Sequence, residues 1–172
     1  IDGPVLEIEN SSFIGLHPVP IVYGMTIGEY GRMINGEGWL ENKTKANLEV
    51  IRIKNYNHNL KYEPPVRPSP NLPNLQSIYL YPSLAFLEKT EVSVGRGTKI
   101  QFQIYGHPNF ISDFSFTPMP NFGSQYPKLN GKLSFGEDLR NYKTKDRVEL
   151  KWLIKSYNQI SDKTKFFRSD FD

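Results

Sequence analysis

Residues 92–105 read VSVGRGTKIQFQIY, and the expected fold is built around this stretch. Its second half alternates strictly between apolar and polar side chains, a period of two that is typical of a strand with one face in the core. The apolar set is Ile100, Phe102 and Ile104, and the polar set is Lys99, Gln101 and Gln103. We therefore predict a strand over residues 99–105, entered through a glycine turn.

Helix and strand patterns alternate on both sides of this strand. Thr26 and Glu29 form a capping box that starts a helix, and Asn35–Gly36 is expected to end it. Further helices are expected from Pro73 to about Pro82 and from about Asp146, and further strands or extended segments at 48–53, 84–94, 114–116 and 132–135. The last helix is expected to begin with a second capping box, Asp146 to Glu149. Its apolar stripe is expected to consist of Leu150, Leu153, Ile154 and Tyr157. This order fits an α/β or α+β fold, with a mixed sheet and packed helices.

Composition limits the classes of protein. The 172 residues are 38% hydrophobic and 13% aromatic, which predicts one globular domain over 1–172. The net charge of +3 comes from scattered basic residues interspersed with acids, so no nucleic-acid partner is expected, although mild positive charge favours an anionic polymer. The chain has no cysteine and no apolar run long enough for a membrane span.

The glycine turn at residues 93–98 is the most distinctive candidate site. Gly97 and its neighbour Gly95 allow backbone N–H groups to approach an anion, while Arg96 can hold a carboxylate with two parallel hydrogen bonds. Ser93 and Thr98 add hydroxyls suited to a sugar. The alternative is a tight turn that only feeds the strand, since glycine is the usual turn residue. The segment lacks the Gly-Lys-Ser/Thr ending of a phosphate-binding loop.

The segment PSPNLP at residues 68–73 precedes a predicted helix. Asn71 or a neighbour can cap that helix, or a rigid loop can present Asn71 to a polar ligand. The three histidines, His17, His58 and His107, have no metal-site spacing, so neither a metal nor a cofactor is expected. Glycosidases need two carboxylates; Glu88 and Glu91 lie near the glycine turn, but the sequence singles out no pair.

Four segments in order resemble the NamZ-type exo-β-N-acetylmuramidase family. They are DGP at 2–4 with FIGLHPVP at 13–20, YGMTIGE at 23–29, PSPNLP at 68–73, and VSVGRGT at 92–98 continuing to GHP at 106–108. The resemblance implies a peptidoglycan hydrolase that releases N-acetylmuramic acid from non-reducing ends. It also implies a two-domain protein, with this chain as the C-terminal domain, starting near the junction with a missing N-terminal Rossmann-like domain.

The resemblance further implies roles for residues. Asn71, Ser93, Arg96, Gly97 and Thr98 are expected to bind substrate, with Arg96 on the lactyl carboxylate and Asn71 and Thr98 on hydroxyls or the acetamido group. The catalytic residues are expected in the missing N-terminal domain, which is the expected partner beside a peptidoglycan-derived saccharide. This chain alone is then inactive, and the whole protein is exported to the periplasm or the extracellular space.

Two alternatives from other classes stay open. One is a non-catalytic saccharide-binding module, which requires only exposed aromatic platforms. The chain offers Trp39, Tyr62, Phe122 and Tyr126 for that purpose. The other is a structural lobe that supports the rest of the protein.

Overall fold

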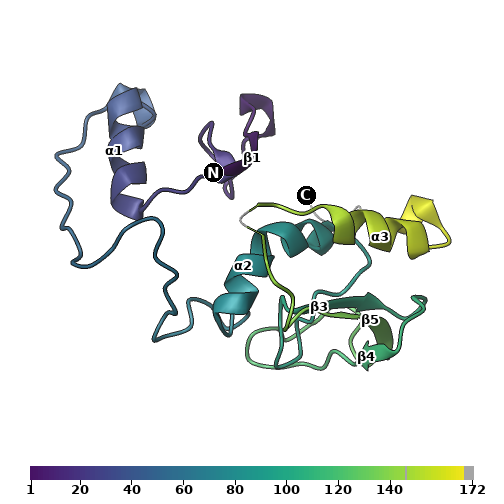
Figure 1. The fold of residues 1–172 in the computed structure, drawn as a ribbon. Helices are drawn as coiled ribbons and strands as arrows, with labels where there is room; N and C mark the ends of the chain where they lie inside the picture. Colours follow the sequence, from purple (N-terminus) through teal and green to yellow (C-terminus); the bar gives the residue numbers. More distant parts are fainter. Residues whose placement is uncertain (146, 169–172) are drawn as a thin grey trace. The chain divides into compact units, whose positions relative to one another are not determined.

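The computed structural model describes residues 1–145 and 147–168, and the chain forms two compact units, Ile1–Lys61 and a second that begins at Tyr62 (Figure 1). The sequence pattern predicted one domain over 1–172, whereas the division falls in the proline-rich segment after the first helix. The buried hydrophobic core explains the division. Among the described residues, all of its members lie beyond residue 79, in the second unit.

The first unit combines a small hairpin with one helix. Strands β1 (Asp2–Val5) and β2 (Pro20–Val22) pair antiparallel, and helix α1 spans Ile27–Glu37. The predicted capping box is confirmed, because the Glu29 N–H donates to the Thr26 hydroxyl at 3.3 Å and the Thr26 N–H donates to the Glu29 carboxylate at 2.8 Å. The helix ends at Gly38 with φ of 73°, two residues later than Gly36. Short 3₁₀ turns η1 (Ile8–Asn10) and η2 (Glu41–Lys43) complete the unit.

An aromatic cluster lies at the base of α1. The His17 ring stacks on Trp39 with centroids 5.3 Å apart, and His17 Nδ1 lies 2.8 Å from the Tyr30 hydroxyl. Tyr23 in turn stacks on Tyr30 at 5.0 Å. These contacts hold the extended segment before α1 against the helix.

The second unit packs two helices with a three-stranded antiparallel sheet. Strands β3 (Ile104–His107), β4 (Phe114–Phe116) and β5 (Ser134–Asp138) have the order β3-β5-β4, with Tyr105 opposite Glu137 and Ser115 opposite Phe135. Helix α2 (Leu75–Leu84) continues into η3 (Ala85–Lys89), and α3 (Lys151–Gln159) precedes η4 (Lys163–Lys165). Helices α2 and α3 contact one another (Figure 1).

One hydrophobic cluster joins these elements. It takes Leu80 and Leu84 from α2, Tyr105 from β3 and Trp152 from α3, all less than 4% exposed. The mixed helix and strand content predicted from sequence is confirmed, and its ladders are antiparallel. No helix among the described residues is both long and apolar enough to cross a bilayer.

The predicted strand over 99–105 is wrong for its first half. Residues 99–103 form turns, and regular pairing begins only at Ile104. Phe102 has φ of 53°, a left-handed conformation that interrupts an extended chain, and its N–H donates to the Val94 carbonyl at 2.8 Å. Gln101 and Gln103 are as buried as the apolar set, so the alternation does not separate two faces.

Other predicted segments also differ. Residues 48–53 form no strand, because a strand needs a partner and the described part of the first unit places none beside them. In the 84–94 segment, residues 85–89 form the 3₁₀ turn η3, and residues 90–94 form only isolated bridges at Thr90 and Ser93. Strand 114–116 is confirmed, whereas 132–135 begins later, at Ser134. Pro82 lies inside α2 rather than ending it. The proposed cap at Asp146 lies outside the described residues.

Candidate functional site

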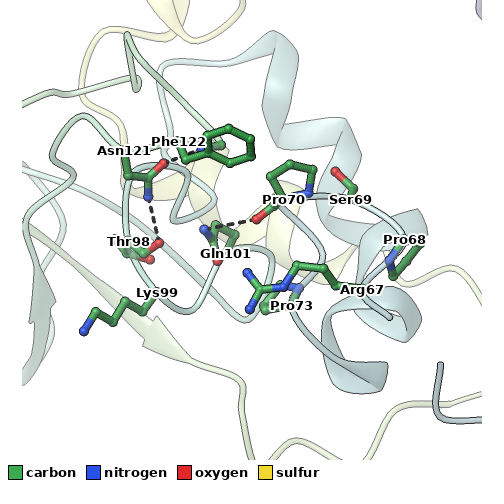
Figure 2. Close-up of a pocket in the computed structure, with 11 residues that line it drawn as sticks. Arg67, Pro68, Ser69, Pro70, Pro73, Thr98, Lys99, Gln101, Asn121 and Phe122 are labelled. Carbon is green, nitrogen blue, oxygen red and sulfur yellow. Dashed lines mark hydrogen bonds between the residues drawn. The ribbon is translucent and has the colours of Figure 1, made fainter. Parts of the chain in front are cut away.

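Three segments distant in sequence surround a cavity of about 640 Å³ in the second unit (Figure 2). This volume is within the range of small-molecule sites, roughly 300–1,000 Å³. The walls bring the PSPNLP segment together with the end of the glycine turn, so two of the motifs singled out in the sequence meet. The lining residues are Arg67, Pro68, Ser69, Pro70, Pro73, Thr98, Lys99, Gln101, Asn121, Phe122 and Gly123.

Thr98 is the one residue of the predicted glycine-turn set that lines this cavity. Its hydroxyl donates to the Gly95 carbonyl at 2.7 Å and accepts from the Ile100 N–H at 3.1 Å. Its carbonyl accepts from the Asn121 side-chain amide at 3.1 Å. The Thr98 side chain therefore shapes the turn, and its polar groups are already engaged within the protein.

Gly97 is required by the path of the backbone. It has φ of 82°, and a Cβ there would lie 2.6 Å from the Met119 carbonyl oxygen and 2.7 Å from Pro127. Ser93 is 1% exposed, and its hydroxyl accepts from the Gly95 N–H at 3.2 Å. Neither residue lines the cavity.

Arg96 faces a different cavity from Thr98. Its guanidinium donates to Glu88 Oε2 from Nε at 2.7 Å and pairs with the same oxygen through Nη2 at 2.6 Å. The guanidinium carbon lies 5.0 Å from the centre of the Phe102 ring. Arg96, Glu88 and Glu91 together line a second, strongly charged cavity with Lys128. The charge of Arg96 is thus balanced before any ligand arrives.

Lys128 fixes the chain that leads into the glycine turn. Its ammonium donates to the carbonyls of Leu87, Glu88 and Val92 at 3.0 Å each, and to that of Thr90 at 2.5 Å. Burial lowers the pKa of Lys128 to about 8, and the nearby Glu88 carboxylate opposes that shift. One half-buried cation therefore holds four carbonyl groups between residues 87 and 92, two of them at the end of η3.

Asn71 lies behind the cavity wall. Helix α2 is capped by Asn74 through a capping box with Ser77, which settles the capping alternative in favour of a neighbour. The Asn71 side chain is free of that role and donates to the Gly123 carbonyl at 2.7 Å. Asn71 is only 8% exposed, and its Oδ1 atom has no hydrogen-bond partner among the described residues.

Gln101 is the most informative residue that sequence reasoning missed. It lines the cavity at 5% exposure, and its amide donates to the Pro70 carbonyl only at the long distance of 3.5 Å. Its Oε1 atom accepts no hydrogen bond from the described residues. A buried acceptor without a donor costs about 1–3 kcal/mol, so such groups point to a missing partner. The sequence signal was a glutamine between apolar residues.

Phe122 stands at the cavity edge as an exposed ring. It is 94% exposed and belongs to a tight turn in which Asn121 Oδ1 accepts from the N–H groups of Gly123 and Ser124, at 3.0 and 2.9 Å (Figure 2). Such a ring offers an apolar face to the C–H side of a sugar. The ring was anticipated as an aromatic platform, but its place beside Thr98 and Gln101 was not.

The histidines lie at separate places. His17 belongs to the aromatic cluster, and His58 lies 3.1 Å from Glu29. His107 accepts from the Asn109 N–H at 3.2 Å, and burial lowers its pKa. None of the three lines the cavity described above.

Two family models cover this chain. Residues 1–76 match "Exo-beta-N-acetylmuramidase NamZ, N-terminal", and residues 79–171 match "Exo-beta-N-acetylmuramidase NamZ, C-terminal". The chain therefore belongs to the NamZ family of exo-β-N-acetylmuramidases. The sequence prediction put the junction between the two family domains near residue 1, whereas the two models meet between residues 76 and 79.

Individual relatives agree with this family. The peptidoglycan beta-N-acetylmuramidase NamZ of Bacillus subtilis (strain 168) is 39% identical over 112 residues, which is 63% of this chain and 26% of that protein. A DUF1343 family protein of Bacteroides fragilis NCTC 9343 superposes with a TM-score of 0.94 at 43% identity, covering 98% of this chain and 49% of its own. A second protein of that description from the same strain, with a TM-score of 0.66 at 21% identity over 83% of this chain and 42% of its own, shares the fold. The chain thus spans between a quarter and a half of these relatives.

Proposed function

We propose that the cavity between residues 67–73, 98–101 and 121–123 binds a saccharide unit of peptidoglycan as part of an exo-β-N-acetylmuramidase. The observation that carries this proposal is the unpartnered Oε1 of buried Gln101 in a cavity edged by the exposed Phe122 ring. A sugar provides what both lack: its hydroxyls or acetamido N–H donate to the oxygen once the Gln101 amide turns its enclosed Oε1 toward the cavity, while its C–H face lies on the ring. We take peptidoglycan as the polymer because the name of the Bacillus subtilis relative contains it.

This cavity supplies binding rather than acid–base chemistry. Its described lining residues include no Asp or Glu, whereas glycoside hydrolysis ordinarily uses a pair of carboxylates across the scissile bond. We therefore place the catalytic carboxylates in parts of the complete protein outside this chain, and we expect this chain alone to be inactive. A cell-wall substrate also implies that the complete protein works in the periplasm or outside the cell.

The first test removes the unpartnered oxygen. Gln101→Met keeps the length of the side chain and discards the buried acceptor, so we expect thermal stability to be maintained or raised. Binding of N-acetylmuramic acid, measured by calorimetry, should weaken by roughly tenfold, since a hydrogen bond in a desolvated site contributes about 1 kcal/mol or more. Gln125→Met, on an exposed glutamine outside the cavity, is the matched control and should bind normally. Equal affinity for both variants would remove Gln101 from the site.

The second test separates the enzyme from the non-catalytic alternative. Release of chromophore from a para-nitrophenyl N-acetylmuramide is compared between this chain and the complete protein. We expect activity only from the complete protein, with this chain still binding the sugar. A complete protein that binds but releases nothing would leave the saccharide-binding module as the function. Activity from this chain alone would make a carboxylate such as Glu88 or Glu91 catalytic.

A further inference from the structure

The charge on the cavity wall has one sign. Of the eleven lining residues, Arg67 and Lys99 are the charged ones, and both are cations. Among the described residues, neither forms an ion pair or a hydrogen bond. In Figure 2 the side chain of Arg67, the residue just before the PSPNLP segment, extends toward Gln101 and Pro73, while Lys99 lies at the opposite edge. The cavity thus presents two cationic side chains and no anion, with the Gln101 side chain in its wall.

The guanidinium of Arg96 is less available to a ligand than that of Arg67. Arg96 is paired with Glu88 at 2.6 Å and lines the other cavity. Recruiting it would require breaking this ion pair and leaving a partly buried carboxylate alone. Arg67 needs no such exchange, since its guanidinium is solvated and can form two parallel hydrogen bonds with a carboxylate.

We infer that Arg67, supported by the positive potential of Lys99, receives the carboxylate of an acidic amino sugar whose hydroxyl or acetamido group reaches Gln101. The inference rests on the proposed function and adds to it the residue that recognises the acidic substituent. In N-acetylmuramic acid this substituent is a lactyl ether, which distinguishes it from neutral N-acetylglucosamine. The cavity then selects the acidic sugar through charge, and it binds either sugar through Gln101 and the Phe122 ring.

The test measures the affinity of this chain for both sugars. Wild type should bind N-acetylmuramic acid roughly fivefold to tenfold more tightly than N-acetylglucosamine, as expected for one charge-assisted interaction at a partly exposed site. Arg67→Met should abolish that preference, because it weakens N-acetylmuramic acid binding more than N-acetylglucosamine binding. Lys99→Met should reduce the preference partly, and raised salt should reduce it in wild type. Arg140→Met makes the same change in net charge at a residue outside this cavity and should keep the preference.

The outcomes separate the inference from the proposed function. If wild type binds both sugars equally, the saccharide site stands and the inference is overturned. If Arg96→Met removes the preference and Arg67→Met does not, the carboxylate belongs to Arg96 and the inference is again overturned. If wild type binds neither sugar, the proposed function fails, and the inference fails with it.

Discussion

At the residue scale, half-buried Lys128 and buried Gln101 show opposite relations to their surroundings. Lys128 has four acceptors for three N–H groups, whereas Gln101 Oε1 has no donor among the described residues. The first arrangement is what stability requires of a buried cation, and the second is what a ligand site leaves open. The two residues should therefore respond differently to substitution, Lys128 through folding and Gln101 through binding.

We predict that Lys128→Met lowers the free energy of unfolding by about 2 kcal/mol or more at pH 7, because it leaves several carbonyl groups without their shared donor. Urea denaturation followed by circular dichroism measures this change. Lys132→Met, on an exposed lysine of the same segment, should stay within about 0.5 kcal/mol of wild type. Equal stability of the two variants would show that solvent satisfies these carbonyls.

At the element scale, helix α1 depends on a local electrostatic device. The pKa of Glu29 is lowered to about 2, first by the hydrogen bond from the Thr26 N–H and then by that from His58. A carboxyl group with a lowered folded pKa stabilises the protein at pH values above its ordinary pKa of 4.5. This stabilisation is lost as the pH falls through about 2.

We expect Glu29→Gln to weaken the amide hydrogen-exchange protection of α1 at pH 7, with the difference from wild type shrinking toward zero near pH 2. Glu37→Gln, at the other end of the same helix, is the control, since a negative charge there gains nothing from the helix dipole. A deficit for Glu29→Gln that persists unchanged at pH 2 would contradict the electrostatic explanation.

The elements also show what a sequence alone can predict. The start of α1 was predictable because its capping box involves residues three apart. The absence of strands at 48–53 and 99–103 was not predictable, since pairing depends on distant segments and the φ of Phe102 on tertiary packing. At α3 the predicted stripe includes Leu150 and Ile154, which are 46% and 57% exposed, while Trp152, two positions from each, is buried. The large indole, rather than the aliphatic pattern, decides which face enters the core.

In the candidate site, too, local patterns were predictable and contacts between distant residues were not. Thr98 and Asn71 were found because their segments are unusual in sequence, yet only Thr98 lines the cavity. Gln101, Asn121 and Phe122 come together through hydrogen bonds across more than 20 residues, such as that from Asn121 to the Thr98 carbonyl. No local pattern reports such contacts.

At the scale of the whole molecule, the two units differ in what stabilises each of them internally. The second has a continuous buried hydrophobic cluster, whereas no hydrophobic residue described in the first falls in the buried class. Burial of apolar surface is the main source of stability, so the first unit should open at lower cost. The segment 44–61 between α1 and the second unit is exposed almost throughout.

We therefore predict that limited trypsin digestion first cuts between residues 44 and 67, where Arg52, Lys54 and Lys61 are exposed. A fragment that begins within or just after this segment should then persist, and mass spectrometry identifies its start. Mild urea should accelerate digestion of the first unit before that of the second. First cuts between residues 80 and 140 would contradict this order of stability.

The chain has two tryptophans, one in each unit: Trp39 stacks on His17, and Trp152 lies 3% exposed in the core. Each unit thus carries its own intrinsic optical label. Trp152 should emit at shorter wavelengths than Trp39, because its indole lies in dry surroundings. Substituting either indole by Phe would leave a protein whose light reports on one unit at a time.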